Sequence, residues 1–301
     1  MKTFLGLSAL VLTTLFASLA GAQQGLTKLA DNVYSYADVK NGSPANSFAA
    51  NAGIVVGRDG ILVIDTLISA REAKRFIADI RKISDKPIKY VVDTHYHLDH
   101  SFGNSEFVRL GATIISQAND RDNLEKKGEA ALKHAKDYGL SDADLAGTVI
   151  TLPTLTFTDR MTIDLGGETV ELIFVAPSHT EGSALVYLPR HKILFTGDIL
   201  FTDFHPFMGD GDIGGWVKNL DFILGLDVTT IIPGHGPLSS KKDIAEMKEY
   251  IQLFDRKARE LAAKTQDADK IAAELKKVLP AKSQGEWMIA YNLKVKYLAG
   301  K

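Results

Sequence analysis

The sequence predicts a mixed α/β (α+β) fold in four layers, with two β-sheets packed face to face and helices on their outer sides. Apolar runs of strand length alternate with segments of helical periodicity, and this order occurs in two similar halves. No linker rich in Pro, Gly or Ser separates the halves. The 301 residues, 45% of them hydrophobic, are enough to bury a large core. We therefore expect a single folded domain over residues 23–301.

The first half is expected to open with a β-hairpin. Apolar runs at 49–56 and 61–65 flank the turn sequence Gly57-Arg58-Asp59-Gly60. Ser69 is a suitable N-cap, and apolar residues at helical spacing follow it to Ile83. The other elements expected here are a strand at 88–92, a short helix at 103–108, a strand at 112–115 and a charged helix at 119–138.

The second half repeats this alternation. Strands are expected at 155–157, 169–175, 184–188 and 193–196, then a helix at 215–226 and a strand at 229–232. Three amphipathic helices follow from about residue 240, at 240–263, 268–278 and 284–298. We expect these helices to pack on the sandwich, and a dimer face is the alternative use of their apolar sides. The sequence does not define the oligomeric state.

The N-terminus has the pattern of a secretory signal peptide, residues 1–22. A short basic start precedes an apolar stretch at 4–19, and Ala20-Gly21-Ala22 fits a small-x-small cleavage site. An anchoring transmembrane helix is the alternative, but the stretch is short and no charge cluster follows it. We expect a secreted or periplasmic protein that starts near Gln23 and has no stable membrane span after cleavage.

Composition excludes several classes of function. Lys and Arg (35) nearly balance Asp and Glu (37), so no basic surface for nucleic acid is indicated. The chain has no cysteine, which excludes disulfides, thiolate zinc sites and a thiol nucleophile. Any metal site must therefore be built from carboxylates and the eight histidines.

Four potential metal ligands lie within six residues directly after the strand at 88–92. The segment reads Asp93-Thr94-His95-Tyr96-His97-Leu98-Asp99-His100. On an extended segment, residues i and i+2 face the same way, so His95 and His97 can bind one metal together. The chain must then turn, which directs Asp99 and His100 towards a second ion. A lone histidine is more often structural, but four ligands at this spacing indicate metal binding.

Three further ligand-type residues each follow a predicted strand. They are His179, Asp198 and His235. Ligands at the ends of several strands converge on one rim of a layered fold, which is a common place for active sites.

These motifs resemble those of the metallo-β-lactamase superfamily. The chain carries them, in the family's order, as T-H-Y-H-L-D-H, S-H-T-E-G-S, F-T-G-D and P-G-H-G. The resemblance implies the four-layer αββα metallo-β-lactamase sandwich and two Zn²⁺ ions per chain. By motif, His95, His97 and His179 would hold the first ion and Asp99, His100 and His235 the second. Asp198 would bridge the two ions.

The expected function is hydrolysis of a small molecule. A hydroxide bridging the two ions, oriented by Asp99, would attack the carbonyl of a lactam, lactone, ester or thioester. Imidazole and carboxylate also accept iron or manganese. The alternatives are a β-lactamase proper, acting on β-lactam antibiotics, and a non-hydrolytic periplasmic metal- or ligand-binding protein.

The bridging position distinguishes subfamilies. Lactamases of the commonest subclass resemble this pattern but have Cys where Asp198 stands and lack a ligand His at position 100. Asp198 is similar to the bridging Asp of glyoxalase II and lactonases. Export and the absence of a recognisable C-terminal substrate domain argue against glyoxalase II itself.

Three residues are candidates for support of the site or contact with substrate. Asp65 ends a strand and could orient a ligand imidazole through its second ring nitrogen. Thr180 could tune the loop around His179. His205 lies in the aromatic segment 201–210, which follows Asp198 and is expected to line the substrate pocket, and we expect it to be the polar contact there.

Overall fold

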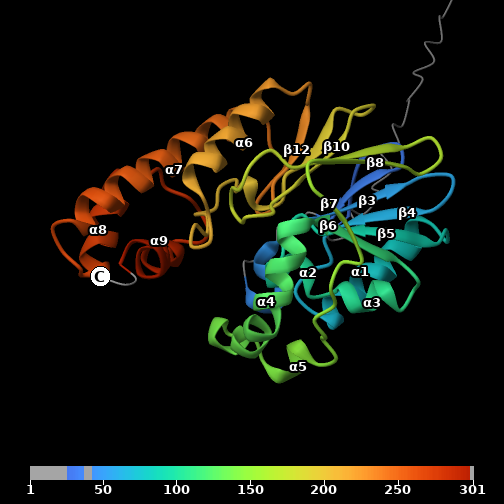
Figure 1. Ribbon diagram of the computed structural model, residues 1–301, viewed down its shortest axis with the longest axis horizontal. Helices are drawn as coiled ribbons and strands as arrows, with labels where there is room; N and C mark the ends of the chain where they lie inside the picture. Colours follow the sequence, from blue (N-terminus) through green and yellow to red (C-terminus); the bar gives the residue numbers. More distant parts are fainter. Residues whose placement is uncertain (1–25, 37–42, 299–301) are drawn as a thin grey trace, which may run out of the picture.

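The computed structural model describes residues 26–36 and 43–298. The predicted signal peptide, residues 1–22, lies outside the described residues. Within them, two sheets form the centre of the molecule and helices lie on either side (Figure 1). The four-layer prediction is confirmed.

The first sheet has seven strands in sequential order, β1 to β7. The strands β1 to β4 pair antiparallel, and β4 to β7 pair parallel. Their bounds are β1 Thr27–Ala30, β2 Val33–Tyr36, β3 Ala52–Val56, β4 Ile61–Ile64, β5 Ile88–Val92, β6 Thr113–Gln117 and β7 Leu155–Phe157. Because β4 and β5 run parallel, their carboxyl ends lie at the same edge, where the first ligand motif begins.

The second sheet has five strands in the order β12-β11-β10-β9-β8. All neighbours pair antiparallel except β11 and β12, which run parallel. Their bounds are β8 Arg160–Asp164, β9 Thr169–Ile173, β10 Leu185–Leu188, β11 Ile193–Phe195 and β12 Thr230–Ile232. The parallel pair again brings two loops to one edge: the loop after β11 carries Asp198 and the loop after β12 carries His235.

The core between the sheets joins apolar side chains from both. Leu62 and Val92 of the first sheet belong to one buried cluster with Val186 and Phe195 of the second. These side chains are at most 3% exposed. Their burial removes apolar surface from water, which is the main driving force for holding the two sheets together.

Helices cover the outer faces of both sheets (Figure 1). On the side of the first sheet they are α1 Ala70–Ile83, α2 Leu98–Ser101, α3 Asn104–Val108, α4 Ala118–His134 and α5 Asp142–Leu145. Helix α1 begins where predicted, and the Ser69 hydroxyl accepts a hydrogen bond from the backbone N–H of Glu72 at 3.3 Å.

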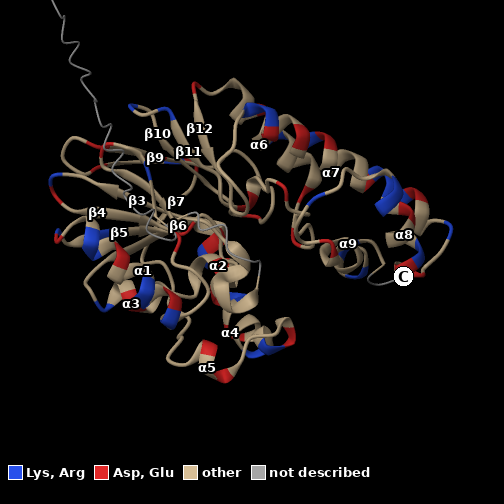
Figure 2. Cartoon of the chain, turned by 180° about the vertical axis from the view of Figure 1, so that it is seen from behind, with Lys and Arg blue, Asp and Glu red and all other residues tan. Residues whose placement is uncertain are grey.

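The C-terminal helices pack on one another in sequence order, each against the one before it, and extend beyond the second half of the sandwich (Figure 1). Their bounds are α6 Ile213–Gly225, α7 Lys241–Ala262, α8 Ala268–Val278 and α9 Trp287–Asn292. Buried residues of all four helices share one apolar cluster with strands β9 to β12. Helix α7 packs against α6, and basic and acidic residues alternate along the length of α7 (Figure 2). Among the described residues, none of the helices has the length and apolar character needed to span a membrane.

Several elements differ from those expected. The strands β1, β2 and β8 were not predicted. The helix expected at 119–138 ends at His134 and continues as a 3₁₀ turn, Ala135–Tyr138. The helix expected at 284–298 is the short α9, followed by a π-helical turn, Leu293–Tyr297.

Candidate metal centre

The first group of candidate ligands consists of His95, His97, His179 and Asp198. One ligand atom from each lies within 4.8 Å of the others. Nε2 of His179 is 2.9 Å from Nδ1 of His97 and 3.3 Å from Oδ2 of Asp198, and Nε2 of His95 is 3.7 Å from the same oxygen. The loops after β5 and β9 and the turn after β11 therefore bring three imidazoles and one carboxylate to a common point.

The second group consists of Asp99, His100 and His235. Oδ2 of Asp99 is 3.3 Å from Nε2 of His235 and 3.7 Å from Nε2 of His100. Asp198 connects the groups, because its Oδ1 lies 3.1 Å from His100 Nε2 and 3.4 Å from His235 Nε2 while its Oδ2 faces the first group. One carboxylate thus offers a different oxygen to each group.

The free polar atoms of the centre fit metal ions. Nε2 of His95, Nε2 of His100 and Oδ1 of Asp198 are buried and make no hydrogen bond in the described chain. Buried polar groups are normally hydrogen-bonded, so such atoms facing one another require another partner. Imidazole nitrogens and carboxylate oxygens are ligands for zinc and also accept iron or manganese.

The second ring nitrogen of every candidate ligand histidine has a polar neighbour within 3.2 Å. This arrangement fixes each ring so that its other nitrogen faces the centre. The neighbours are Thr94 Oγ1 for His95 Nδ1, Asp210 Oδ2 for His97 Nε2, Asp65 Oδ2 for His100 Nδ1, the Phe207 carbonyl for His179 Nδ1 and the Phe48 carbonyl for His235 Nδ1.

Asp65 supports the centre from the end of β4. Its Oδ2 is 2.8 Å from His100 Nδ1 and also accepts a hydrogen bond from the Thr94 hydroxyl, while its Oδ1 accepts one from the Thr94 N–H. The backbone of Asp65 has φ 61°, in the left-handed region that non-glycine residues rarely adopt. The carboxylate thus meets three donors from a strained backbone position. Such strain is typical of functional sites and is consistent with a role of Asp65 in orienting the His100 ring.

A glycine allows the backbone just before His235 to lie close to the Asp198 carboxylate. A Cβ at position 234 would overlap Oδ1 of Asp198, so Gly234 in the P-G-H-G motif cannot be replaced without moving this carboxylate. This packing explains why a glycine directly precedes His235.

Electrostatic interactions divide the histidines into two kinds. Burial disfavours the charged imidazole and lowers the pKa of His179 to about 3 and that of His95 well below its usual value. Burial acts in the same direction on His235, but the carboxylates of Asp198 and Asp99 outweigh it and raise the pKa of His235 to about 9. The protein without metal therefore compensates part of its buried negative charge with protons.

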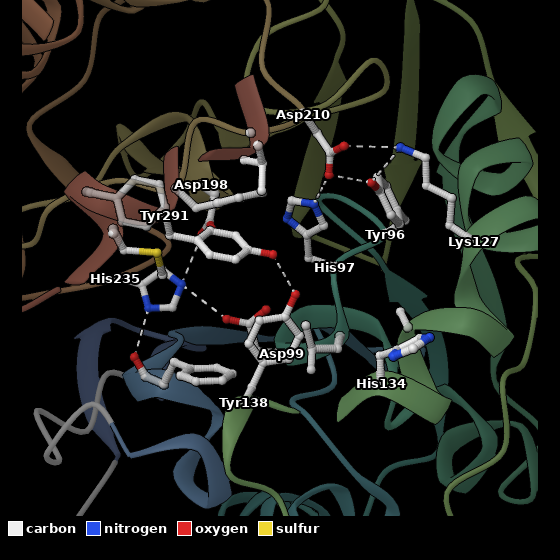
Figure 3. Close-up of a pocket in the computed structure, with 18 of the residues that line it drawn as sticks. Tyr96, His97, Asp99, Lys127, His134, Tyr138, Asp198, Asp210, His235 and Tyr291 are labelled. Atoms are coloured by element: carbon white, nitrogen blue, oxygen red, sulfur yellow. Dashed lines mark hydrogen bonds and ion pairs between the residues drawn. The ribbon is translucent and has the colours of Figure 1, made fainter. Parts of the chain in front are cut away.

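An open cavity of about 500 Å³ lies directly above the centre (Figure 3). Asp99, Asp198, His97 and His235 form part of its lining. The rest of the lining is mainly aromatic and aliphatic, from the segment 201–210 and from helices α4 and α9. This volume lies within the range of roughly 300–1,000 Å³ usual for small-molecule sites.

Of the other residues predicted to support the site or contact the substrate, Thr180 lies in the loop of a ligand and His205 lies outside the cavity lining. The Thr180 hydroxyl lies 2.8 Å from the hydroxyl of Ser183, inside the loop that carries His179. His205 is not in the cavity lining, contrary to expectation, and its Nδ1 is 2.7 Å from the Tyr250 hydroxyl. Phe204 and Phe207 take the positions that face the cavity.

A polar cluster beside His97 was not predicted. Asp210 accepts a hydrogen bond from the Tyr96 hydroxyl at 2.7 Å, lies 3.0 Å from His97 Nε2 and forms an ion pair with Lys127 at 3.2 Å (Figure 3). Lys127 lies on α4 and Asp210 in the loop before α6, so only the folded chain brings them together. The aromatic character of 201–210 predicted that this segment lines the pocket, but it did not single out Asp210.

Helix α9 also contributes to the cavity, which was not predicted. Trp287, Met288, Tyr291 and Val295, from α9 and the turn after it, line the cavity opposite α4. The hydroxyl of Tyr291 is 2.9 Å from that of Tyr138, so a hydrogen bond links this wall to the segment after α4 (Figure 3).

Comparison with known proteins agrees with the fold and the site. The sequence profile described as the metallo-beta-lactamase superfamily matches residues 46–235, which include all seven candidate ligands. The chain belongs to the metallo-β-lactamase superfamily. Its members are metal-dependent hydrolases, and relatives of this chain include a sulfatase and β-lactamases.

Three curated relatives illustrate this range. A linear primary-alkylsulfatase from a Pseudomonas species is 29% identical over 223 residues, which are 63% of this chain and 42% of that protein. The metallo-beta-lactamase type 2 of Bacteroides fragilis is 23% identical over 234 residues, 77% of this chain and 86% of that protein. The subunit alpha of a 2,4-dinitroanisole O-demethylase from a Nocardioides species is also similar, at 25% identity over 68% of this chain. This chain spans 42% of the length of the alkylsulfatase and 57% of that of the demethylase subunit.

Solved structures show the same fold. A metallo-beta-lactamase from Pontibacter korlensis covers 75% of this chain and 98% of its own, with a TM-score of 0.59 at 21% identity. A double mutant of the sec-alkyl sulfatase PisA1 covers 92% of this chain and 51% of its own, with a TM-score of 0.67 at 21% identity.

Proposed function

We propose that this chain is an exported hydrolase that uses two zinc ions to cleave a carbonyl-containing bond in a small molecule, such as a lactam, lactone, ester or thioester. The observation that supports this most directly is the position of Asp198. Its two carboxylate oxygens face two separate groups of ligand atoms at the base of an open cavity. Two metal ions sharing one carboxylate require this arrangement.

Different residues of the chain would bind each of the two ions. His95, His97 and His179 would hold one ion, while Asp99, His100 and His235 would hold the other and Asp198 would be shared. When bound, the ions would supply a hydroxide nucleophile near neutral pH and positive charge to stabilise an oxyanion. Asp99 lines the cavity, so its carboxylate can accept a hydrogen bond from the nucleophile and orient it towards the substrate.

Metal analysis joined to a substrate panel tests the proposal. We expect two zinc ions per chain and turnover of at least one of nitrocefin, a lactone, a carboxylic ester and a thioester. A single iron per chain would contradict the zinc assignment. Full zinc loading without turnover of any of these substrates would favour the non-hydrolytic metal- or ligand-binding protein.

Substitution of Asp99 by Asn is the sharpest single test. We expect kcat/KM to fall more than about a hundredfold, because the change removes both a ligand and the group that orients the nucleophile. Asp142→Asn on the exposed surface of α5 is the matched control and should leave kcat/KM unchanged. Equal activity of the two variants would rule out this role for Asp99.

Two further substrate classes are supported by relatives. The Pseudomonas relative is named for linear primary alkyl sulfates, and the sulfatase structure covers 92% of this chain. The Bacteroides fragilis relative supports β-lactamase activity proper. Sodium dodecyl sulfate and nitrocefin therefore belong in the panel, and preferential turnover of either would identify the bond.

A further inference from the structure

The wall of the cavity away from the metal centre comes from two helices that are distant in sequence. Helix α4 contributes Ala130 and Ala131, whose small side chains leave space. Helix α9 and the turn after it contribute Trp287, Met288 and Val295. Trp287 is 48% exposed and Val295 is 38% exposed, although both are large apolar side chains. Apolar surface left open inside a concave site is typical of a ligand-binding site.

The polar groups on this part of the lining already have partners within the protein. Lys127 forms an ion pair with Asp210 at 3.2 Å, and Nδ1 of His134 lies 3.0 Å from a carboxylate oxygen of Asp137. The hydroxyls of Tyr138 and Tyr291 are paired with each other (Figure 3). No unpaired charge therefore remains in the described lining outside the metal centre to attract a charged ligand group.

From these observations we infer that the cavity between α4 and α9 binds an uncharged, apolar body of the substrate, such as a long acyl or alkyl chain or an aromatic ring system. The inference rests on the proposed function, because the same cavity contains Asp99 and Asp198. A molecule bound in it has its reactive end at the metal centre and its apolar body against α9. The substrate class is then an amphiphile with a cleavable group next to a large apolar part.

The test uses the zinc-loaded protein and a chain-length series. The substrates are 4-nitrophenyl acetate, butanoate, octanoate and dodecanoate, and ethyl, butyl, octyl and dodecyl sulfates. Burying a methylene contributes about 0.8 kcal/mol, so kcat/KM should rise by up to about fourfold per added methylene until the cavity is full. Binding of the uncharged probe N-phenyl-1-naphthylamine is measured in parallel, because it does not depend on turnover.

A variant that fills the cavity provides the decisive comparison. Ala130 is exposed on α4 and lines the cavity, so Ala130→Trp should not disturb the core. It should weaken probe binding at least tenfold and abolish the preference for long chains, while the shortest substrate is still cleaved. Ala273→Trp makes the same change at an exposed position of α8 outside the cavity lining and should behave as the unmodified protein.

Each outcome separates the inference from the proposed function. Hydrolysis that is independent of chain length, or equal effects of the two tryptophan variants, would overturn the apolar-body inference and leave the hydrolase intact. Probe binding that Ala130→Trp removes, without turnover of any substrate, would overturn the hydrolase and support the cavity as an apolar site. Absence of both probe binding and chain-length dependence would overturn the inference.

Discussion

At the scale of single residues, Asp65 shows how the chain orients a ligand imidazole. All three of its polar neighbours are donors to the carboxylate: the N–H and hydroxyl of Thr94, and Nδ1 of His100. In Asp65→Asn, the amide NH₂ must face one of these donors and cannot accept a hydrogen bond from it. The contacts that orient the His100 ring are therefore weakened. We expect about a tenfold to hundredfold loss of zinc affinity, measured by competition with a chelator. Asp31→Asn, at a site 90% exposed, is the control, and equal affinities would contradict the role.

The raised pKa of His235 predicts a pH dependence of the protein without metal. The carboxylates of Asp198 and Asp99 raise the pKa of His235 from 6.5 to about 9 against the effect of burial, and the pKa of His100 is raised in the same way. A raised pKa stabilises the folded state fully below about pH 6.5, and this stabilisation is lost as the pH rises through about 9.

We therefore expect the urea concentration at the unfolding midpoint of the metal-free protein to decrease as the pH rises from 6.5 to 9. In the zinc-loaded protein this fall should be absent, because metal binding requires neutral imidazoles and replaces the protons. His235→Gln in the metal-free state should show a smaller decrease. A midpoint that rises over this interval would contradict the assignment of charge.

At the scale of elements, α7 tests whether the C-terminal helices belong to the same folding unit. Ile251 is fully buried in the cluster that α7 shares with α6 and the second sheet. Ile251→Ala should lower the free energy of unfolding by about 2–5 kcal/mol in one cooperative transition. The exposed neighbour Glu249→Ala should change it by less than about 0.5 kcal/mol. Two separate unfolding transitions would show that the helices fold independently.

Two of the strands that were not predicted, β1 and β8, share a physical cause. Strand β8 is an edge strand in which only Ile163 is buried, so its alternation of polar and apolar residues is weak. Strand β1 has no fully buried residue. Their strand conformation depends on pairing with neighbours already in the sheet, which is a tertiary effect. The apolar strands and the long amphipathic helices carry their own signal and were located from it.

At the scale of the whole molecule, the ligand positions and the contribution of segment 201–210 to the cavity were predictable, while the wall formed by α9 was not. The ligand motifs lie at strand ends, so strand order brings His179 and His235 to one edge of the second sheet, and packing of the two sheets places His95 beside them. The wall opposite the centre depends on where α9 packs, and this follows from the apolar cluster of the second half rather than from any local motif. The ion pair between Asp210 and Lys127 likewise depends on how distant segments pack and is not marked by a local motif.

The proposed export is tested on the whole chain. The basic start, apolar stretch and Ala20-Gly21-Ala22 predict that the mature protein begins at Gln23. Intact mass and N-terminal sequencing of protein recovered from a periplasmic fraction should show this start. Replacement of Ala20 and Ala22 by bulky residues should leave the uncleaved precursor. Cytoplasmic protein that retains Met1 would contradict the proposal.

The hydrogen bond between Tyr138 and Tyr291 joins the segment after α4 to a wall of the cavity that lies beyond every candidate ligand in the sequence. The last candidate ligand is His235, but the wall that Tyr291 belongs to comes later in the chain. All seven candidate ligands therefore precede the residues of α9 that line the cavity. The candidate ligands and this wall are thus encoded in separate stretches of the sequence, so the wall can vary without a change at any ligand position.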